Sequence, residues 1–200
     1  MSKDIQYTYY YEDAFSQEEI EERRLYLNTE VDSDTVDTIV YHILRYNRLD
    51  KDVPKEQRTP IKLYINSPGG SVVDGFSVID AILNSTTPVY TINLAMSASM
   101  AFLIFIAGHK RYTLPHSEFL MHDGFTASFN SAGKVKDQIE FETVQLGNAT
   151  KKYVLKQTDI SEEKYAEKER IEWYMLPLEA KQYGIVDYIV GEDCDMDEII

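Results

Sequence analysis

The chain has almost no cysteine, and it is poor in positive charge. Cys194 is the single cysteine among 200 residues, so no disulfide can form within the chain, and a reducing compartment such as the cytoplasm is expected. Lysine and arginine total 20 against 34 aspartates and glutamates, which gives a net charge of −14. Nucleic-acid binding requires a basic face, so this composition argues against that class of function.

Long apolar runs and the common cofactor motifs are also missing. No apolar segment is long enough to span a membrane, and the residues that follow Met1 do not resemble a secretory signal. The sequence has no His-Glu-x-x-His or other metal-ligand spacing, and no Gly-x-x-x-x-Gly-Lys-Ser/Thr loop for ATP. We therefore expect a cytoplasmic protein that uses no metal and no cofactor.

The apolar pattern that is present predicts an α/β fold. Strands are expected at residues 24–27 and 89–94, and helices at residues 33–46, 73–84 and 100–107. Because strands and helices alternate, the connections must cross over the sheet, and parallel strands should dominate it. The length suits one domain over residues 24–200, preceded by an N-terminal arm over residues 1–23.

A long helix is expected over residues 134–157, and its apolar stripe is thin. Val135, Ile139 and Leu146 fall near one line of this helix, together with the charged Glu142. A helix with such a mixed stripe cannot bury itself against its own sheet, so it must pack against something else. The sequence therefore predicts an oligomer.

Candidate catalytic residues follow the predicted strands. Ser99 lies between the strand at 89–94 and an apolar helix, a turn that exposes a hydroxyl beside backbone N–H groups, as acyl transfer requires. His122 follows a second short apolar strand, and Pro68-Gly69-Gly70 forms a turn through which backbone can approach a substrate. On these residues alone, a helix-capping serine and a plain turn remain the alternatives.

Together these segments resemble the Clp protease proteolytic subunit family of ring-forming serine peptidases. The motifs that carry the resemblance are Tyr-Ile-Asn-Ser-Pro-Gly-Gly-Ser-Val at 64–72, Ser-Ala-Ser-Met-Ala at 97–101, Lys-Arg-Tyr-Thr-Leu-Pro-His-Ser at 110–117, Met-His at 121–122, and residues 180–187. Their order and spacing match over about residues 24–190. The resemblance implies a ClpP/crotonase-like fold of repeated β-β-α type units with a protruding handle, a long helix plus a strand, at about residues 125–157.

The resemblance also implies a role for each site residue. Ser99 would be the nucleophile and His122 the general base, with the backbone N–H groups of Gly69 and Met100 as the oxyanion hole. The third triad position falls on Glu172, where the family has aspartate. Glu169 and Glu167 are nearby alternatives for that position, and a serine–histidine dyad without a side-chain partner is another.

The implied function is a serine endopeptidase subunit that cleaves peptides and unfolded polypeptides through an acyl-enzyme. The implied partners are further copies of the chain, in stacked heptameric rings, and an AAA+ unfoldase of the Clp type. Lys62 puts the unfoldase in doubt, because the family usually has an aromatic residue there, and Ile171 replaces an arginine implicated in ring contact. The alternatives are an inactive ring paralogue and a crotonase-type acyl-CoA enzyme, which would leave Ser99 and His122 unexplained.

Overall fold

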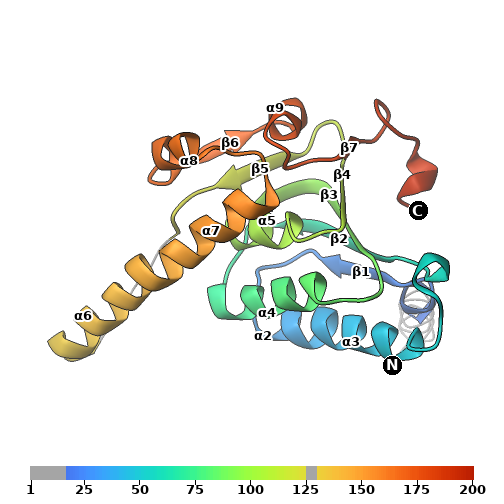
Figure 1. Ribbon diagram of the computed structural model, residues 1–200, viewed down its shortest axis with the longest axis horizontal. Helices are drawn as coiled ribbons and strands as arrows, with labels where there is room; N and C mark the ends of the chain where they lie inside the picture. Colours follow the sequence, from blue (N-terminus) through green and yellow to red (C-terminus); the bar gives the residue numbers. More distant parts are fainter. Residues whose placement is uncertain (1–16, 125–129) are drawn as a thin grey trace, which may run out of the picture.

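A sheet dominated by parallel strands forms the centre of the computed structural model, which describes residues 17–124 and 130–200 (Figure 1). The main path of the sheet runs β1 (Arg24–Leu27), β2 (Ile61–Ser67), β3 (Val89–Ala98), β4 (Lys110–Thr113) and β7 (Tyr188–Ile189), and every neighbouring pair on it is parallel. The expected α/β fold with a parallel-dominated sheet is therefore confirmed.

The sheet branches at its longest strand, and this branch positions the candidate site. The first half of β3 pairs with β4, whereas Met96 to Ala98 pair with β5 (Glu118–Met121). A short strand, β6 (Trp173–Met175), then runs antiparallel to β5. As a result β3 and β5 end side by side, and the residues that follow them lie at one edge of the sheet.

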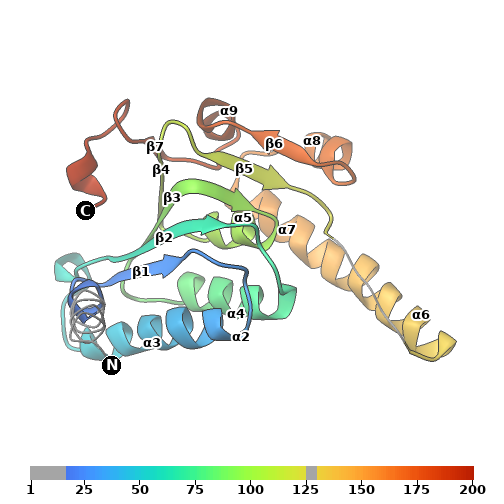
Figure 2. The same ribbon diagram turned by 180° about the vertical axis from the view of Figure 1, so that it is seen from behind.

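Helices cover one face of the sheet (Figures 1 and 2). A continuous helical stretch contains α2 (Ser33–Thr35), the π-helical η1 (Val36–Val40) and α3 (Tyr41–Leu49), and α4 (Val72–Leu83) lies beside it. The short α5 (Met100–Phe105) starts directly after β3. Ile43, Ile79 and Phe102 are each no more than 1% exposed in the core between these helices and the sheet. The helices expected at 33–46 and 73–84 are thus present, the first longer than expected.

A long helix projects from the body of the molecule (Figures 1 and 2). It runs without interruption through α6 (Ala132–Glu140), the π-helical η3 (Phe141–Leu146) and α7 (Gly147–Gln157). Only its last part packs on the sheet domain, where Val154 is 1% exposed and the Tyr153 hydroxyl donates to the Leu103 carbonyl at 2.9 Å. The first part of the expected handle, residues 125–129, and most of the expected arm, residues 1–16, lie outside the described residues.

The remaining elements complete the domain. They are η2 (Lys55–Gln57), α8 (Glu162–Lys168), α9 (Pro177–Gln182) and η4 (Met196–Glu198). None of the helices in the described ranges is long and apolar enough to cross a membrane.

Candidate active site

Ser99 occupies a strained junction between β3 and α5. Its backbone has φ 54° and ψ −120°, a left-handed conformation that non-glycine residues seldom adopt. The Ser99 amide donates to the Leu120 carbonyl at 2.9 Å, which holds the turn against β5. The serine hydroxyl makes no capping hydrogen bond to α5, so the helix-cap alternative for this residue is not supported.

His122 lies next to Ser99 because of the branch in the sheet. Ala98 is paired in register with Leu120, so the chain leaves both strands at the same edge, one residue later for Ser99 and two residues later for His122. Both side chains line one groove with a volume of about 600 Å³. The Nε2 atom of His122 is buried and has no hydrogen-bond partner among the described residues, the Ser99 hydroxyl included. A buried polar atom without a partner calls for a functional explanation.

The walls of this groove come from distant parts of the chain. Its lining includes apolar side chains of α5 and β5 and, from the projecting helix, Glu142, Leu146 and Lys151. Glu169 and Arg170, from the segment after α8, also line it. The groove therefore combines apolar side chains with charges of both signs.

The Pro-Gly-Gly turn approaches Ser99 so closely that only glycine fits. A Cβ atom added to Gly69 would lie 2.7 Å from the Met100 nitrogen and 2.7 Å from the Ala98 carbonyl oxygen, and Gly69 has a φ of 95°. Met100 is the first residue of α5, and its side chain is buried against Gly75. Gly69 and Met100, the expected oxyanion donors, are thus close together. The Gly69 N–H, however, already has an acceptor, because it donates to the Ser67 hydroxyl at 3.1 Å.

Gly70 is a further candidate donor that the sequence analysis did not single out. Val31 donates to the Gly69 carbonyl at 2.8 Å and accepts from the Ser71 amide at 2.7 Å, so the N–H of Gly70 faces away from Val31. That direction is toward the β3 side of β2, where Ser99 lies. The Gly70 N–H has no partner within the described part of the chain. The double glycine was visible in the sequence, but only the hydrogen-bond pattern distinguishes the two amides.

Glu172 and His122 adjoin the same end of the β5–β6 ladder, and no hydrogen bond joins them within the described residues. Met121 and Trp173 are the last pair of that ladder, with His122 following Met121 and Glu172 preceding Trp173 along the chain. The Glu172 side chain is exposed, and its carboxylate accepts a hydrogen bond from the Tyr174 hydroxyl at 3.1 Å, which raises the pKa of Tyr174. Of the alternatives, Glu169 lines the groove. Glu167 instead forms ion pairs with two lysines of its own helix region.

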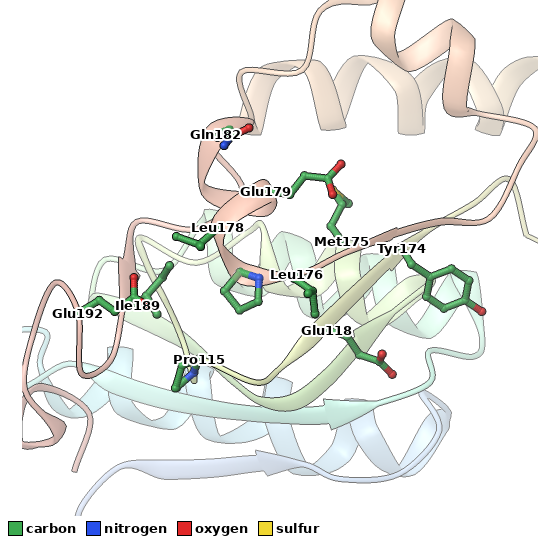
Figure 3. A pocket seen from close by; sticks show the side chains of 11 residues that line it. Pro115, Glu118, Tyr174, Met175, Leu176, Leu178, Glu179, Gln182, Ile189 and Glu192 are labelled. Carbon is green, nitrogen blue, oxygen red and sulfur yellow. The ribbon is translucent and has the colours of Figure 1, made fainter.

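A second groove, formed by β5, β6 and α9, has different chemistry (Figure 3). Its volume is about 510 Å³, and its lining includes the largely exposed Leu176 and Leu178 together with Tyr174. No serine or histidine is among the described residues that line it. Among these two grooves, the one lined by Ser99 and His122 alone contains a serine and a histidine among its described lining residues. Within the described ranges, no group of three or more histidine, cysteine, aspartate or glutamate side chains is placed to hold a metal.

Comparison with known proteins identifies the family. The sequence model described as Clp protease matches residues 10–193, nearly the whole chain. The chain therefore belongs to the Clp protease family. A similar relative is the ATP-dependent Clp protease proteolytic subunit of Deinococcus radiodurans, which is 29% identical over 175 residues, or 86% of this chain and 82% of the relative.

The Clp protease family accounts for the class of chemistry. Its members are serine-type peptidases, so this chain is a member of a family of peptide-bond hydrolases rather than of the crotonase-type enzymes considered as an alternative. The mixed α/β architecture described above agrees with the ClpP fold.

Proposed function

We propose that this chain is a serine endopeptidase subunit whose site consists of Ser99 and His122. The observation that carries the proposal is the pairing of a strained serine with a buried, unpartnered His122 Nε2 in one groove. Strained backbone persists where the surrounding structure over-determines it, and such positions cluster at active sites. The peptidase domain is residues 24–200.

In the proposed first step, the Ser99 hydroxyl attacks the carbonyl carbon of a bound peptide, and its proton passes to His122 Nε2. The former carbonyl oxygen becomes an oxyanion, held by the Met100 N–H and by the N–H of Gly69 or Gly70. Each preorganised donor of this kind typically contributes ~3 kcal/mol to lowering the barrier. The Gly70 N–H has no other partner in the described structure, which favours it over Gly69.

In the second step the protonated imidazole gives its proton to the leaving amine as the peptide bond breaks, and the acyl-enzyme on Ser99 remains. A water molecule then repeats the attack, with His122 taking a proton from the water and returning it to Ser99. Glu172 would orient the imidazole. For that role its carboxylate must turn from Tyr174 toward His122, which follows the last residue of the β5–β6 ladder.

The subunit is proposed to assemble into stacked heptameric rings through the projecting helix. Ile139, Phe141 and Val144 on that helix are 46%, 52% and 52% exposed, so these large apolar side chains are not covered within the described chain. The Deinococcus relative is named as an ATP-dependent subunit. Because this sequence has no P-loop, ATP use would belong to a partner unfoldase.

The test is peptide hydrolysis by the Ser99→Ala variant. It should lose all measurable turnover of short fluorogenic peptides while keeping its assembly, because the variant lacks only the nucleophile. Ser97→Ala is the matched control: the Ser97 hydroxyl is buried and unpartnered among the described residues, so its removal should cost little. Turnover by Ser99→Ala equal to that of the unaltered protein would refute the assignment.

A second candidate is a ring paralogue that does not turn over peptides. It is favoured by the hydrogen bond that holds Glu172 on Tyr174, away from the imidazole. In that case unaltered protein and Ser99→Ala would both be inactive, and both would assemble normally.

A further inference from the structure

Three buried side-chain atoms have no hydrogen-bond partner within the described part of the chain, and each belongs to β3 or follows β5. They are Asn93 Oδ1, Ser97 Oγ and His122 Nε2. The proposed mechanism uses the imidazole, but it gives no role to Asn93, whose side chain is fully buried in the middle of β3. A buried acceptor without a partner is less stable than an apolar group of the same shape, so Asn93 needs an explanation.

Asn93 lies where β3 exchanges one neighbouring strand for another. It is the last residue of β3 that pairs with β4, where its partner is Thr113, and pairing with β5 begins three residues later at Met96. In the described structure, Leu94 and Ala95 pair with neither of these two strands. Such a gap inside the sheet leaves backbone groups without ladder partners, and buried backbone groups must then find other ones.

The Asn93 side chain and its neighbours bridge this gap. The Asn93 Nδ2 group donates to the carbonyl of Glu118, the first residue of β5, at 3.0 Å. The Asn93 carbonyl accepts from the Leu114 N–H at 3.1 Å. The Ser117 hydroxyl lies 3.1 Å from the Asn93 carbonyl and 2.7 Å from that of Leu114. The start of β5 is therefore attached to β3 through both the side chain and the main chain of Asn93.

The attachment of β5 determines where His122 lies. The strand has four residues, Glu118 to Met121, and His122 follows it directly. At the far end of β5, the Ser99 N–H donates to the Leu120 carbonyl at 2.9 Å. The strand is thus fixed to β3 at both ends, by Asn93 and by the turn at Ser99. A change in the register of β5 would move the imidazole relative to the Ser99 hydroxyl.

We propose that Asn93 is a positioning residue for His122. Its carboxamide, held on the Glu118 carbonyl, sets the register of β5 on β3 and with it the distance from the imidazole to the Ser99 hydroxyl. No apolar side chain could supply this donor, which accounts for an asparagine with an unpartnered Oδ1 at this position. Asn93 is not among the described residues that line the groove, so it acts through β5. The inference rests on the proposed role of His122 as the base.

The test compares Asn93→Leu with Thr91→Val. Leucine is close to asparagine in size but cannot donate to Glu118. Thr91 is the matched control, because it is fully buried on the same strand and its hydroxyl donates to the Phe105 carbonyl at 2.8 Å, away from β5. Each change removes one buried hydrogen bond, so similar decreases in melting temperature are expected.

The first readout is peptide hydrolysis at a temperature at which both variants are folded. Asn93→Leu should lower kcat about 10- to 100-fold, since a catalytic group displaced by about 1 Å can lose that much in rate. Its KM should change less than about twofold, and Thr91→Val should keep the kcat of the unaltered protein. Asn93→Thr, with a side chain one bond shorter than the carboxamide, is a second variant with the same expected result.

Hydrogen–deuterium exchange gives a readout that needs no activity. Peptides that cover residues 118–123 should exchange faster in Asn93→Leu than in Thr91→Val or the unaltered protein, because β5 loses its attachment at its start. If the unaltered protein hydrolyses no peptide, the proposed function fails, and exchange still decides whether Asn93 holds β5. Equal exchange in the two variants, an unchanged kcat in Asn93→Leu, or equal losses of kcat in both would overturn the proposal.

Discussion

At the scale of single residues, the types of the site residues were readable from the sequence, but their geometry was not. A serine after a buried strand and a histidine after another indicated acyl transfer. The φ of 54° at Ser99 arises from contacts with β5 and with the glycine turn, which lie far away in sequence. The same long-range hydrogen bonds distinguish Gly70 from Gly69, so the sequence analysis had no basis for choosing between them.

Substitution of Glu172 tests whether this residue orients His122. Glu172→Gln should lower kcat, because an amide no longer stabilises the imidazolium and favours the wrong tautomer. In an Asp-based triad such a change costs ~10⁴ in kcat. A smaller loss is expected here, because the longer side chain must first leave Tyr174. The measurement is kcat across a pH series.

Tyr174→Phe is the matched control for this prediction. It removes the competing hydroxyl and should leave kcat unchanged or raise it. An unchanged kcat in Glu172→Gln would assign the third position to another group, of which Glu169 lines the groove, or to none.

At the scale of helices and strands, prediction succeeded where the signal was local. The apolar residues of α4 recur at helical spacing, and the helix that ends with α7 is polar with a narrow apolar stripe. Both patterns can be read from consecutive residues. The strand β6 was not predicted, because it has three residues and exists only through pairing with β5. The hydrogen bond from the Tyr64 hydroxyl to the Ile199 carbonyl was likewise not predicted, since it joins residues more than a hundred positions apart.

An ion pair that joins several elements makes a testable contribution to stability. Asp50, at the end of α3, accepts from Arg23 at 2.6 and 2.7 Å and from the Thr87 hydroxyl at 2.7 Å. Its side chain is 5% exposed. Asp50→Asn should lower the free energy of unfolding at pH 7 by about 2–3 kcal/mol, because Arg23 keeps only a neutral partner.

The pH dependence of that loss follows from the pKa of Asp50. The hydrogen bonds from Arg23 hold this pKa below its ordinary value, against the opposing effect of burial. The stabilisation is therefore complete above the unfolded pKa of ~3.9 and disappears as pH falls through the lower folded value. Urea unfolding should show a difference in unfolding free energy between the unaltered protein and Asp50→Asn. This difference should be constant from neutral pH to about pH 5 and should narrow below about pH 4. Asp52→Asn, on the exposed neighbouring loop, should show no comparable difference from the unaltered protein. A difference for Asp50→Asn that widens in acid would contradict this account.

At the scale of the whole molecule, the projecting helix is the element that we propose links assembly to the site. One face of this helix lines the Ser99 groove through Glu142 and Leu146, while Phe141 and Val144 do not line it and are exposed. His122 lines the same groove, so displacement of the helix should remove part of the wall around the histidine. An assembly that covers the exposed face would therefore also order the groove.

Charges on the exposed face test this link. Phe141→Asp combined with Val144→Asp should separate the rings and reduce peptidase activity together, because an apolar contact would become a pair of like charges. Sedimentation velocity and a peptide assay on the same samples provide the measurement. Gln145→Asp, also exposed and on the same helix, is the control for charge alone. Intact rings in the double variant, or separated rings with full activity, would contradict the link.

The most direct test of the central claim, that Ser99 is a nucleophile activated by His122, is covalent labelling with a fluorophosphonate probe followed by peptide mass spectrometry. The unaltered protein should carry the probe on Ser99, Ser99→Ala should carry none, and His122→Ala should label far more slowly, because the hydroxyl then has no base to take its proton. Labelling absent from the unaltered protein, or equal in all three proteins, would contradict the account.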